Sequence, residues 1–192
     1  MLSQEFYETD LNREFVRGYE MQILSQGSAP LTAALGGSQG ERVSWGAGHH
    51  REFQERFGHI AGIIIMTEDL PEEHNRVTLD PEMTDSNGIP AAKIQYTISE
   101  NTDKMLGHGV ERAKEVMDAA GAKKVLWSHQ RRNAGWHLLG TARMGEDPST
   151  SVVDRWGRAH DVPNLFIIDR SLFVTGSRVN PTPTIPALAL LT

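Results

Sequence analysis

The sequence lacks several features, and each absence narrows the range of functions. It contains no cysteine, which excludes disulfides, thiolate catalysis, cysteine-ligated zinc and iron–sulfur clusters. No apolar run is long enough to span a membrane, and the charged opening MLSQEFYETDLNREF is unlike a signal peptide. No basic stripe is present and the net charge is −6, which argues against nucleic-acid binding. The compartment stays open between cytoplasm and periplasm, because a cysteine-free protein works in either redox environment.

Two common kinds of catalytic centre are also missing. The histidines include no pair at metal-ligand spacing on a convincing helix and no glutamate-flanked zincin pattern, so we predict no metal site. Ser171 and Ser177 lack a G-x-S-x-G elbow, which makes serine hydrolase chemistry a poor hypothesis.

What remains is an ordinary globular composition. The 192 residues are 39% apolar and 23% charged, and they provide for one to one and a half domains of roughly 150 residues each. The chain stops in mid-run at TIPALALLT without a helix-capping residue, so we expect a fragment of a longer protein.

Helices are predicted in three stretches before the C-terminal region. Apolar residues recur at every fourth position and predict a helix over about residues 4–25: Tyr7, Leu11, Phe15, Tyr19 and Ile23. A short charged helix is expected at REFQERFGH, after a glycine-rich loop. A longer one is expected over residues 99–120, with a Ser or Asn N-cap and Gly121 after its end.

Strands are predicted mainly in the middle of the chain. IAGIIIMTE is a β-branched run, and NRVTLDP and AAKIQYTIS alternate around the turn-rich DPEMTDSNGIP, which predicts an antiparallel hairpin with a long loop. KKVLWSH and NLFIID are read as two more strands. The fold class predicted is therefore α+β, a mainly antiparallel sheet of about five or six strands with helices on one face.

The C-terminal stretch carries most of the chemically suggestive residues. The predicted strand NLFIID leads to Asp169, and the following loop leads to Asn180-Pro181-Thr182 at the start of a last helix. The unpaired N–H groups at that helix start would favour an anion. Alternatively, Asn180 simply caps the helix.

The same stretch resembles the C-terminal signature of the glucose–methanol–choline (GMC) oxidoreductases, FAD-dependent enzymes that oxidise alcohols. Three blocks carry the resemblance in the expected order: WHLLGTARMG, VVDRWGRAHDVPNLFIIDRSLF and NPTPTIPALAL, within residues 136–191. WGAGHH and EDLPEEHNRVTLDPEMTDSNGIPAAKIQY resemble the substrate domain of the bacterial branch that acts on sugars and sugar acids, at scattered positions.

The resemblance implies a role for individual residues. His137 matches the histidine of the family's active-site pair, and Asn180 matches its second member. Asp169 and Arg170 would lie near the FAD pyrophosphate and ribityl chain, and Asn180, Pro181 and Thr182 near the flavin's pyrimidine side. Arg170 stands where a small residue is usual, and Val174 where proline is common, which puts the loop path in doubt.

Physical chemistry agrees with these roles. Alcohol oxidation removes a proton from oxygen and a hydride from carbon, which would pass to flavin N5. Imidazole can accept that proton at neutral pH, and an asparagine amide can orient the alcohol by donating a hydrogen bond. The cofactor performs the redox chemistry while the protein supplies position and electrostatics.

The expected organisation is a substrate-binding domain over residues 1–130 and a C-terminal signature segment over residues 131–192. That segment would normally complete an FAD domain, yet no G-x-G-x-x-G turn follows a strand here, so an N-terminal Rossmann FAD domain is missing. We expect the isolated chain to lack FAD and activity. Its partners would be the missing domain, an alcohol or sugar substrate and an electron-acceptor protein. The alternative is a non-catalytic α+β binding module derived from such an enzyme.

Overall fold

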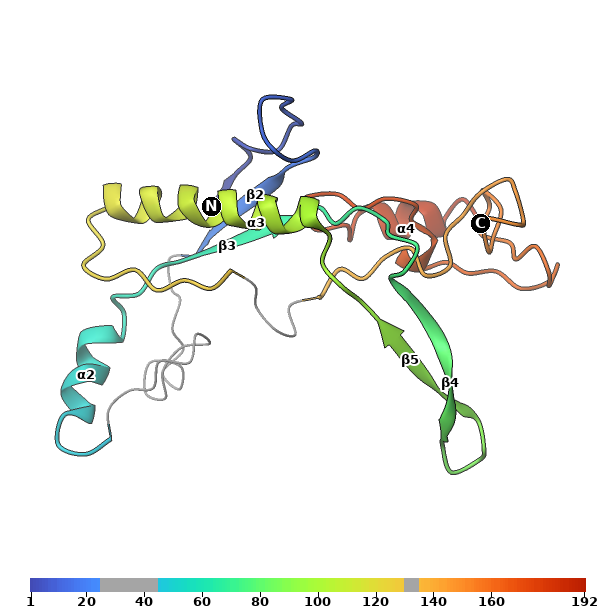
Figure 1. Cartoon of the computed structure of the whole chain (residues 1–192), viewed down its shortest axis with the longest axis horizontal. Coiled ribbons are helices and arrows are strands. Elements are labelled where there is room, and N and C mark those ends of the chain that lie inside the picture. Colours follow the sequence, from blue (N-terminus) through green and yellow to red (C-terminus); the bar gives the residue numbers. More distant parts are fainter. Residues whose placement is uncertain (25–44, 130–134) are drawn as a thin grey trace. The chain divides into compact units, whose positions relative to one another are not determined.

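The computed structural model describes residues 1–24, 45–129 and 135–192 (Figure 1). The chain divides into two compact units. Unit 1 contains residues 1–67 and 103–131, and unit 2 contains residues 68–102 and 132–192. The structure confirms the α+β class with antiparallel sheets. The predicted division near residue 130 differs from these units, because residues 68–102 group with the C-terminal segment.

Unit 1 is built on a three-stranded antiparallel sheet in the order β1-β2-β3: β1 Leu2–Ser3, β2 Tyr19–Leu24 and β3 Gly62–Thr67. The β-branched run Ile63–Ile65 forms β3 as predicted, and Tyr19 pairs with Thr67 in the register. Helix α3, Glu100–Ala119, packs on one face of this sheet through residues that belong to unit 1 (Figure 1). One-sided helix cover agrees with the sequence prediction.

The core of unit 1 lies between this sheet and α3. Tyr19 and Met105 are fully buried, and Phe15 and Met21 pack with them. A Cβ on Gly109 would come within 2.7 Å of Ile65 Cγ2, so glycine allows the helix to approach the strand closely. Burial of this apolar surface stabilises the unit at about 25 cal/mol per Å² removed from water.

The helix predicted over about residues 4–25 is wrong. Residues 19–24 form β2, and the fourfold stripe is not one buried face, because Leu11 is 89% exposed while Tyr19 is buried. Gly18 sits where a Cβ would meet the Phe6 carbonyl oxygen, and Arg17 has a positive φ of 69°. These features turn the chain sharply into the strand, and cross-strand pairing with β3 outweighs a weak local helical pattern.

Two other predicted helices are confirmed. Helix α2 spans His49–Arg56, so it begins two residues before the predicted stretch of residues 51–59 and ends three residues before the end of that stretch. Ser99 caps α3 by accepting a hydrogen bond from the Thr102 N–H at 3.2 Å, and Gly121 follows the helix with φ 77°. The strand predicted at KKVLWSH is wrong. Its side chains contact α3 instead, with Lys114 Nζ lying 4.0 Å from the Trp127 ring centroid and His129 Nε2 lying 2.8 Å from Asp103 Oδ1.

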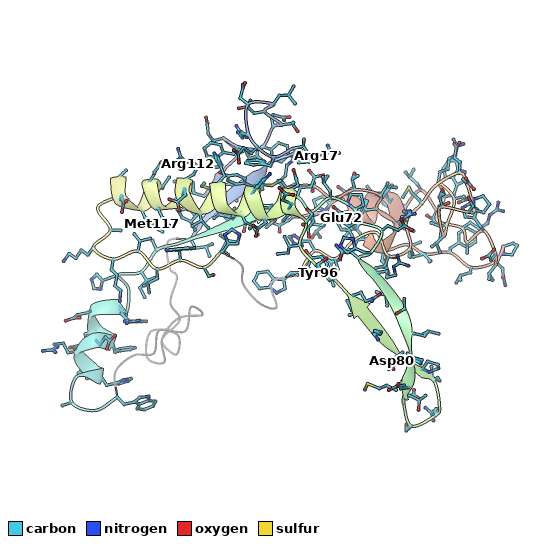
Figure 2. All side chains as sticks on the ribbon, in the orientation of Figure 1. Arg17, Glu72, Asp80, Tyr96, Arg112 and Met117 are labelled. Atoms are coloured by element: carbon cyan, nitrogen blue, oxygen red, sulfur yellow. The ribbon has the colours of Figure 1, made fainter. Side chains whose placement is uncertain are left out.

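Unit 2 contains the predicted antiparallel hairpin, formed by β4 Arg76–Thr84 and β5 Pro90–Gln95 (Figures 1 and 2). β4 continues past the expected loop start with a register shift between Leu79 and Thr84, so the turn is shorter than predicted. Asp85 Oδ1 accepts from two backbone N–H groups of that turn, and Gly88 has φ 80°. The described strands therefore divide between two sheets instead of forming one.

The rest of unit 2 is mostly irregular, with a 3₁₀ turn at Arg170–Leu172 and helix α4 at Thr184–Ala189. Its small core consists of Val153, Ala159 and Leu172. The strand predicted at NLFIID is wrong: the only pairing described there is an isolated bridge between Arg158 and Phe166. The N–H groups of Leu165 and Ile167 donate to carbonyl oxygens of nearby loop residues, and Phe166 is 47% exposed. None of the described helices is long and apolar enough to cross a membrane.

Candidate active site

Two of the signature blocks lie side by side in unit 2. The Ala142 N–H donates to the Ser171 carbonyl at 3.0 Å, and the Met144 N–H donates to the Leu172 carbonyl at 2.9 Å. These backbone bonds join WHLLGTARMG to the 3₁₀ turn that follows Asp169. Two segments about thirty positions apart in the chain are therefore joined by backbone hydrogen bonds.

Glycines make this close approach possible. Gly140 has φ 81°, and a Cβ there would lie 3.1 Å from the Phe173 carbonyl oxygen. A Cβ on Gly176 would lie 3.1 Å from Leu139 Cδ1. The segment after the 3₁₀ turn thus returns to the segment that carries His137.

The two expected catalytic residues stand near this junction. His137 comes two residues before Leu139 and is partly exposed, and Asn180 comes four residues after Gly176 and is exposed. Among the described contacts, no hydrogen bond or ion pair joins the two side chains. The structure therefore brings their segments into contact at Leu139 and Gly176, and both side chains have some solvent exposure.

Asp169 adopts a well-defined local geometry. Its extended backbone caps the 3₁₀ turn, and its Oδ1 accepts from the Ser171 N–H at 2.8 Å. Hydrogen bonds from the Ser171 hydroxyl and N–H hold the pKa of Asp169 below its usual value. An exposed carboxylate that stays ionised can accept hydrogen bonds from ligand hydroxyl groups.

The helix after Asn180 differs from one of the two interpretations of the sequence. Helix α4 begins at Thr184 with Pro183 at the N-cap position, so Asn180 does not cap it. The Thr184 and Ile185 N–H groups both donate to the Pro181 carbonyl, at 3.1 and 3.3 Å. The Thr184 and Ile185 N–H groups are thus engaged within the chain, and the anion site expected at this helix start stays a prediction.

A buried ion pair near Asn180 was not predicted. Arg178 Nε lies 2.9 Å from Glu68 Oε2, and the two side chains are only 10% and 3% exposed. The adjacent Asp69 binds the hydroxyls of Thr102, at 2.6 Å, and of Tyr96, which is labelled in Figure 2. Opposite charges 110 positions apart give no local sequence signal, so only the fold reveals their pairing.

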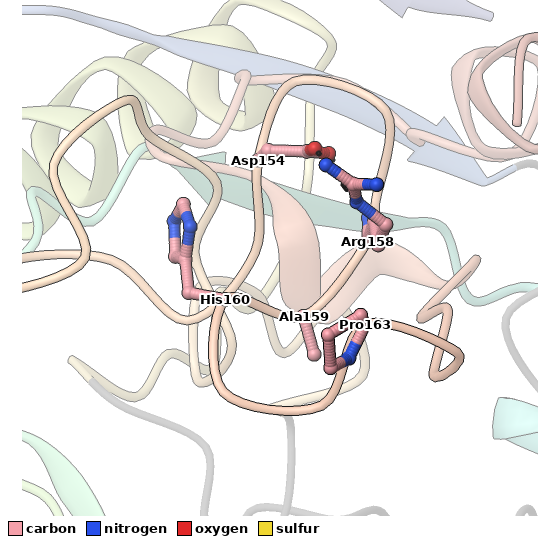
Figure 3. Close-up of a pocket in the computed structure, with 5 residues that line it drawn as sticks. All are labelled: Asp154, Arg158, Ala159, His160 and Pro163. Carbon is pink, nitrogen blue, oxygen red and sulfur yellow. Dashed lines mark hydrogen bonds and ion pairs between the residues drawn. The ribbon is translucent and has the colours of Figure 1, made fainter.

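A polar pocket of about 260 Å³ lies in the loops of unit 2, lined by Asp154, Arg158, Ala159, His160 and Pro163 (Figure 3). His160 Nε2 lies 2.9 Å from Ser151 Oγ, but that hydroxyl donates its proton to the Asp147 carbonyl at 2.6 Å. With the hydroxyl proton directed to that carbonyl, the tautomer of His160 that carries a proton on Nε2 can donate to Ser151 Oγ. Within the described ranges, no group of three acidic or histidine side chains could hold a metal ion.

The residues expected around FAD suit that cofactor chemically. Asp169 can accept from hydroxyls, the Arg170 guanidinium complements phosphate charge, and the amide and hydroxyl of Asn180 and Thr182 can donate hydrogen bonds. The side chains of Asp169, Asn180 and Thr182 are exposed, and that of Arg170 is partly exposed. Pro181 is the exception, because it is buried and its carbonyl accepts hydrogen bonds from the first turn of α4.

Comparison with known proteins identifies the class. A family model described as GMC oxidoreductase matches residues 71–189, which is more than half of the chain. The chain therefore belongs to the GMC oxidoreductase family, as the sequence resemblance implied.

Curated relatives extend this finding. The chain is 43% identical to 2-methyl-1,2-propanediol dehydrogenase of Mycolicibacterium austroafricanum over 99% of this chain and 34% of that protein. It is 32% identical to the fructose dehydrogenase large subunit of Gluconobacter japonicus, over 72% of this chain and 25% of that protein. It is 25% identical to the gluconate 2-dehydrogenase flavoprotein of Pantoea cypripedii, over 91% and 29%. The chain thus spans between a quarter and about a third of these relatives' length.

Proposed function

We propose that this chain is the substrate-domain and C-terminal part of an FAD-dependent oxidoreductase that oxidises a CH–OH group of an alcohol, sugar or sugar acid. The observation that carries the proposal is the junction in unit 2, where Ala142, Met144 and Gly140 meet residues 171–173 and Leu139 meets Gly176. That junction joins the segments of His137 and Asn180. Family membership and the names of the relatives support the reaction class.

In the proposed reaction, His137 accepts the hydroxyl proton on an imidazole nitrogen as the O–H and C–H bonds break and the C=O bond forms. The Asn180 amide donates a hydrogen bond to the same oxygen and holds the carbon in place. Bound FAD would supply the hydride acceptor. Asp169, Arg170 and Thr182 would bind polar groups of the cofactor.

Single-turnover kinetics on the longer flavin-binding polypeptide would test the pair. In His137→Gln and Asn180→Ala, we expect the rate of flavin reduction by the alcohol to fall by about 10²–10⁴ and about 10-fold or more, respectively. His59→Gln is the matched control, because His59 is exposed and lies in unit 1. A reduction rate that stays at the wild-type value in both site variants would refute the proposal.

A substrate panel would narrow the reaction further. The relatives' names suggest comparing a vicinal diol, a ketose and a sugar acid. We expect at least one of these to reduce the flavin, with a primary deuterium isotope effect at the oxidised carbon. Reduction by none of them, with bound FAD intact, would contradict this substrate range.

The 192-residue chain by itself is expected to bind FAD weakly or not at all. It contains no strand-linked G-x-G-x-x-G turn for the ADP half of the cofactor. Titration of the purified chain with FAD, followed by flavin fluorescence, checks this. A yellow stoichiometric complex would overturn the expectation.

A further inference from the structure

We propose that Glu68 and Arg178 are positioning residues, and that their buried ion pair fixes the backbone that presents Asn180. This inference rests on the proposed function for its catalytic consequence and on the geometry of unit 2 for the tether itself. Arg178 and Glu68 lie 2.9 Å apart, with side chains 10% and 3% exposed. Both residues belong to unit 2, although they are separated by 110 positions in the chain.

Asn180 stands between two anchored residues. On its N-terminal side, Arg178 is buried and paired with Glu68, and on its C-terminal side, Pro181 is buried and its carbonyl accepts from the Thr184 and Ile185 N–H groups. The backbone of Asn180 is therefore held on both sides within the four residues 178–181. Proline at 181 also fixes its own φ and restricts Asn180 to extended conformations.

The Glu68 end of the tether is itself held firmly. Its neighbour Asp69 accepts a hydrogen bond from Thr102 Oγ1 at 2.6 Å and another from the Tyr96 hydroxyl at the base of the hairpin. Thr102 in turn is held by Ser99, which accepts from its N–H at 3.2 Å. The carboxylate that meets Arg178 thus projects from a cross-linked corner and not from a free loop.

The same loop also contacts the segment of His137. Gly176, two residues before Arg178, packs against Leu139, which is two residues after His137. A shift of residues 176–180 would therefore change the position of Asn180 relative to the histidine segment. Because a misplacement of about 1 Å can cost about 100-fold in rate, such a tether matters to catalysis without contacting substrate.

Hydrogen–deuterium exchange on the 192-residue chain tests the tether directly. In Glu68→Gln and in Arg178→Met, we expect faster exchange confined to peptides covering residues 174–185, with unit 1 peptides unchanged. Glu146→Gln is the matched control, because it breaks an exposed ion pair. The side chain of Glu146 is 85% exposed and that of its partner Arg155 is 68% exposed. Unchanged exchange over residues 174–185 in both variants would overturn the inference.

A kinetic cycle on the longer flavin-binding polypeptide separates positioning from mere stability. We expect Glu68→Gln to lower kcat by about 10- to 100-fold with a smaller change in KM, and Arg178→Lys to recover part of what Arg178→Met loses. In an Asn180→Ala background, Glu68→Gln should lower kcat little further, because both changes act through one group.

The outcomes are distinguishable. Full additivity of Glu68→Gln and Asn180→Ala would overturn the positioning role, even if exchange at residues 174–185 is faster. Wild-type kcat in Asn180→Ala alone would instead refute the proposed role of Asn180, and with it the catalytic consequence of the tether. The exchange measurement would still decide whether the ion pair holds this loop.

Discussion

Each of the two units is stabilised internally by a different kind of contact. Unit 1 has a continuous sheet with one helix packed on it, and its central side chains, Tyr19 and Met105, are wholly buried. Unit 2 has a hairpin with exposed faces, a three-residue core and many loops. Its order depends on polar contacts, including the ion pair between Glu68 and Arg178.

Turns capped by an aspartate are described at Asp10 in unit 1 and at several positions in unit 2. In unit 2, Asp85, Asp147, Asp154 and Asp169 each accept hydrogen bonds from backbone N–H groups a few positions further along the chain. These local bonds shape turns without a large core. We therefore expect the stability of unit 1 to respond mainly to changes in apolar packing, and that of unit 2 mainly to changes in charge.

The largest expected effect follows from Glu68→Gln in unit 2. Glu68→Gln removes the carboxylate charge that faces Arg178 in a buried ion pair, and such changes cost about 3–5 kcal/mol. The free energy of opening, obtained from hydrogen exchange of peptides covering residues 174–185, measures it. A loss below about 1 kcal/mol would show that charge is not what holds this loop.

Met105→Ala is the corresponding change in unit 1. Truncating a fully buried methionine should lower the free energy of unfolding by about 2–5 kcal/mol, because it removes apolar contacts and leaves a cavity. Denaturant unfolding with exchange of the 19–24 peptide reports on this unit. Met83→Ala, at a residue 65% exposed on the hairpin, is the control and should change stability little.

Acid should weaken unit 1 through His108. Burial lowers the pKa of His108, the positive charges of Arg112 and Arg13 lower it further, and Glu115 opposes them. The Tyr19 hydroxyl lies 2.8 Å from His108 Nδ1, among the rings of Phe6 and Phe15.

The direction of the pH effect follows from linkage. The unfolded chain takes up this proton as pH falls through about 6.5, whereas the folded chain takes it up only at its lower pKa. Stability should therefore decline between these two values and then level. Unfolding of unit 1 between pH 7.5 and 5 measures the decline, and His108→Gln should reduce its slope. An unchanged slope in that variant would assign the decline to other groups.

The smallest expected effect is that of Glu146→Gln in unit 2. Its ion pair with Arg155 spans 3.1 Å but is mostly exposed, and such surface pairs contribute less than about 1 kcal/mol. Thermal unfolding should be nearly unchanged at low and high salt. A loss of stability comparable to that of Glu68→Gln would show that burial does not decide how much each ion pair contributes.

Sequence reasoning predicted the elements whose signals are local. The β-branched run gave β3, alternation around a turn gave the hairpin, and Ser99 and Gly121 marked the ends of α3. It failed where tertiary contacts decide, as in β2, whose helical period is outweighed by pairing with β3. It also failed at NLFIID, because an apolar run does not reveal whether partner strands are available.

Part of the candidate site was predictable, because its residues lie in recognisable local sequence blocks. His137, Asn180 and Asp169 emerged from ordered blocks that resemble a family, and family membership is confirmed. Their catalytic and cofactor-binding roles stay predictions. The Glu68–Arg178 pair was not predictable, because pairing between distant charges depends on the folded chain.

The most direct test of the central claim is flavin reduction in His137→Ala of the longer flavin-binding polypeptide, measured with and without added imidazole. We predict that the rate falls by about 10²–10⁴ and that imidazole in solution restores part of it, since the proposed role of the side chain is to accept the alcohol proton. A variant that is reduced by the alcohol as fast as the wild type would contradict the account.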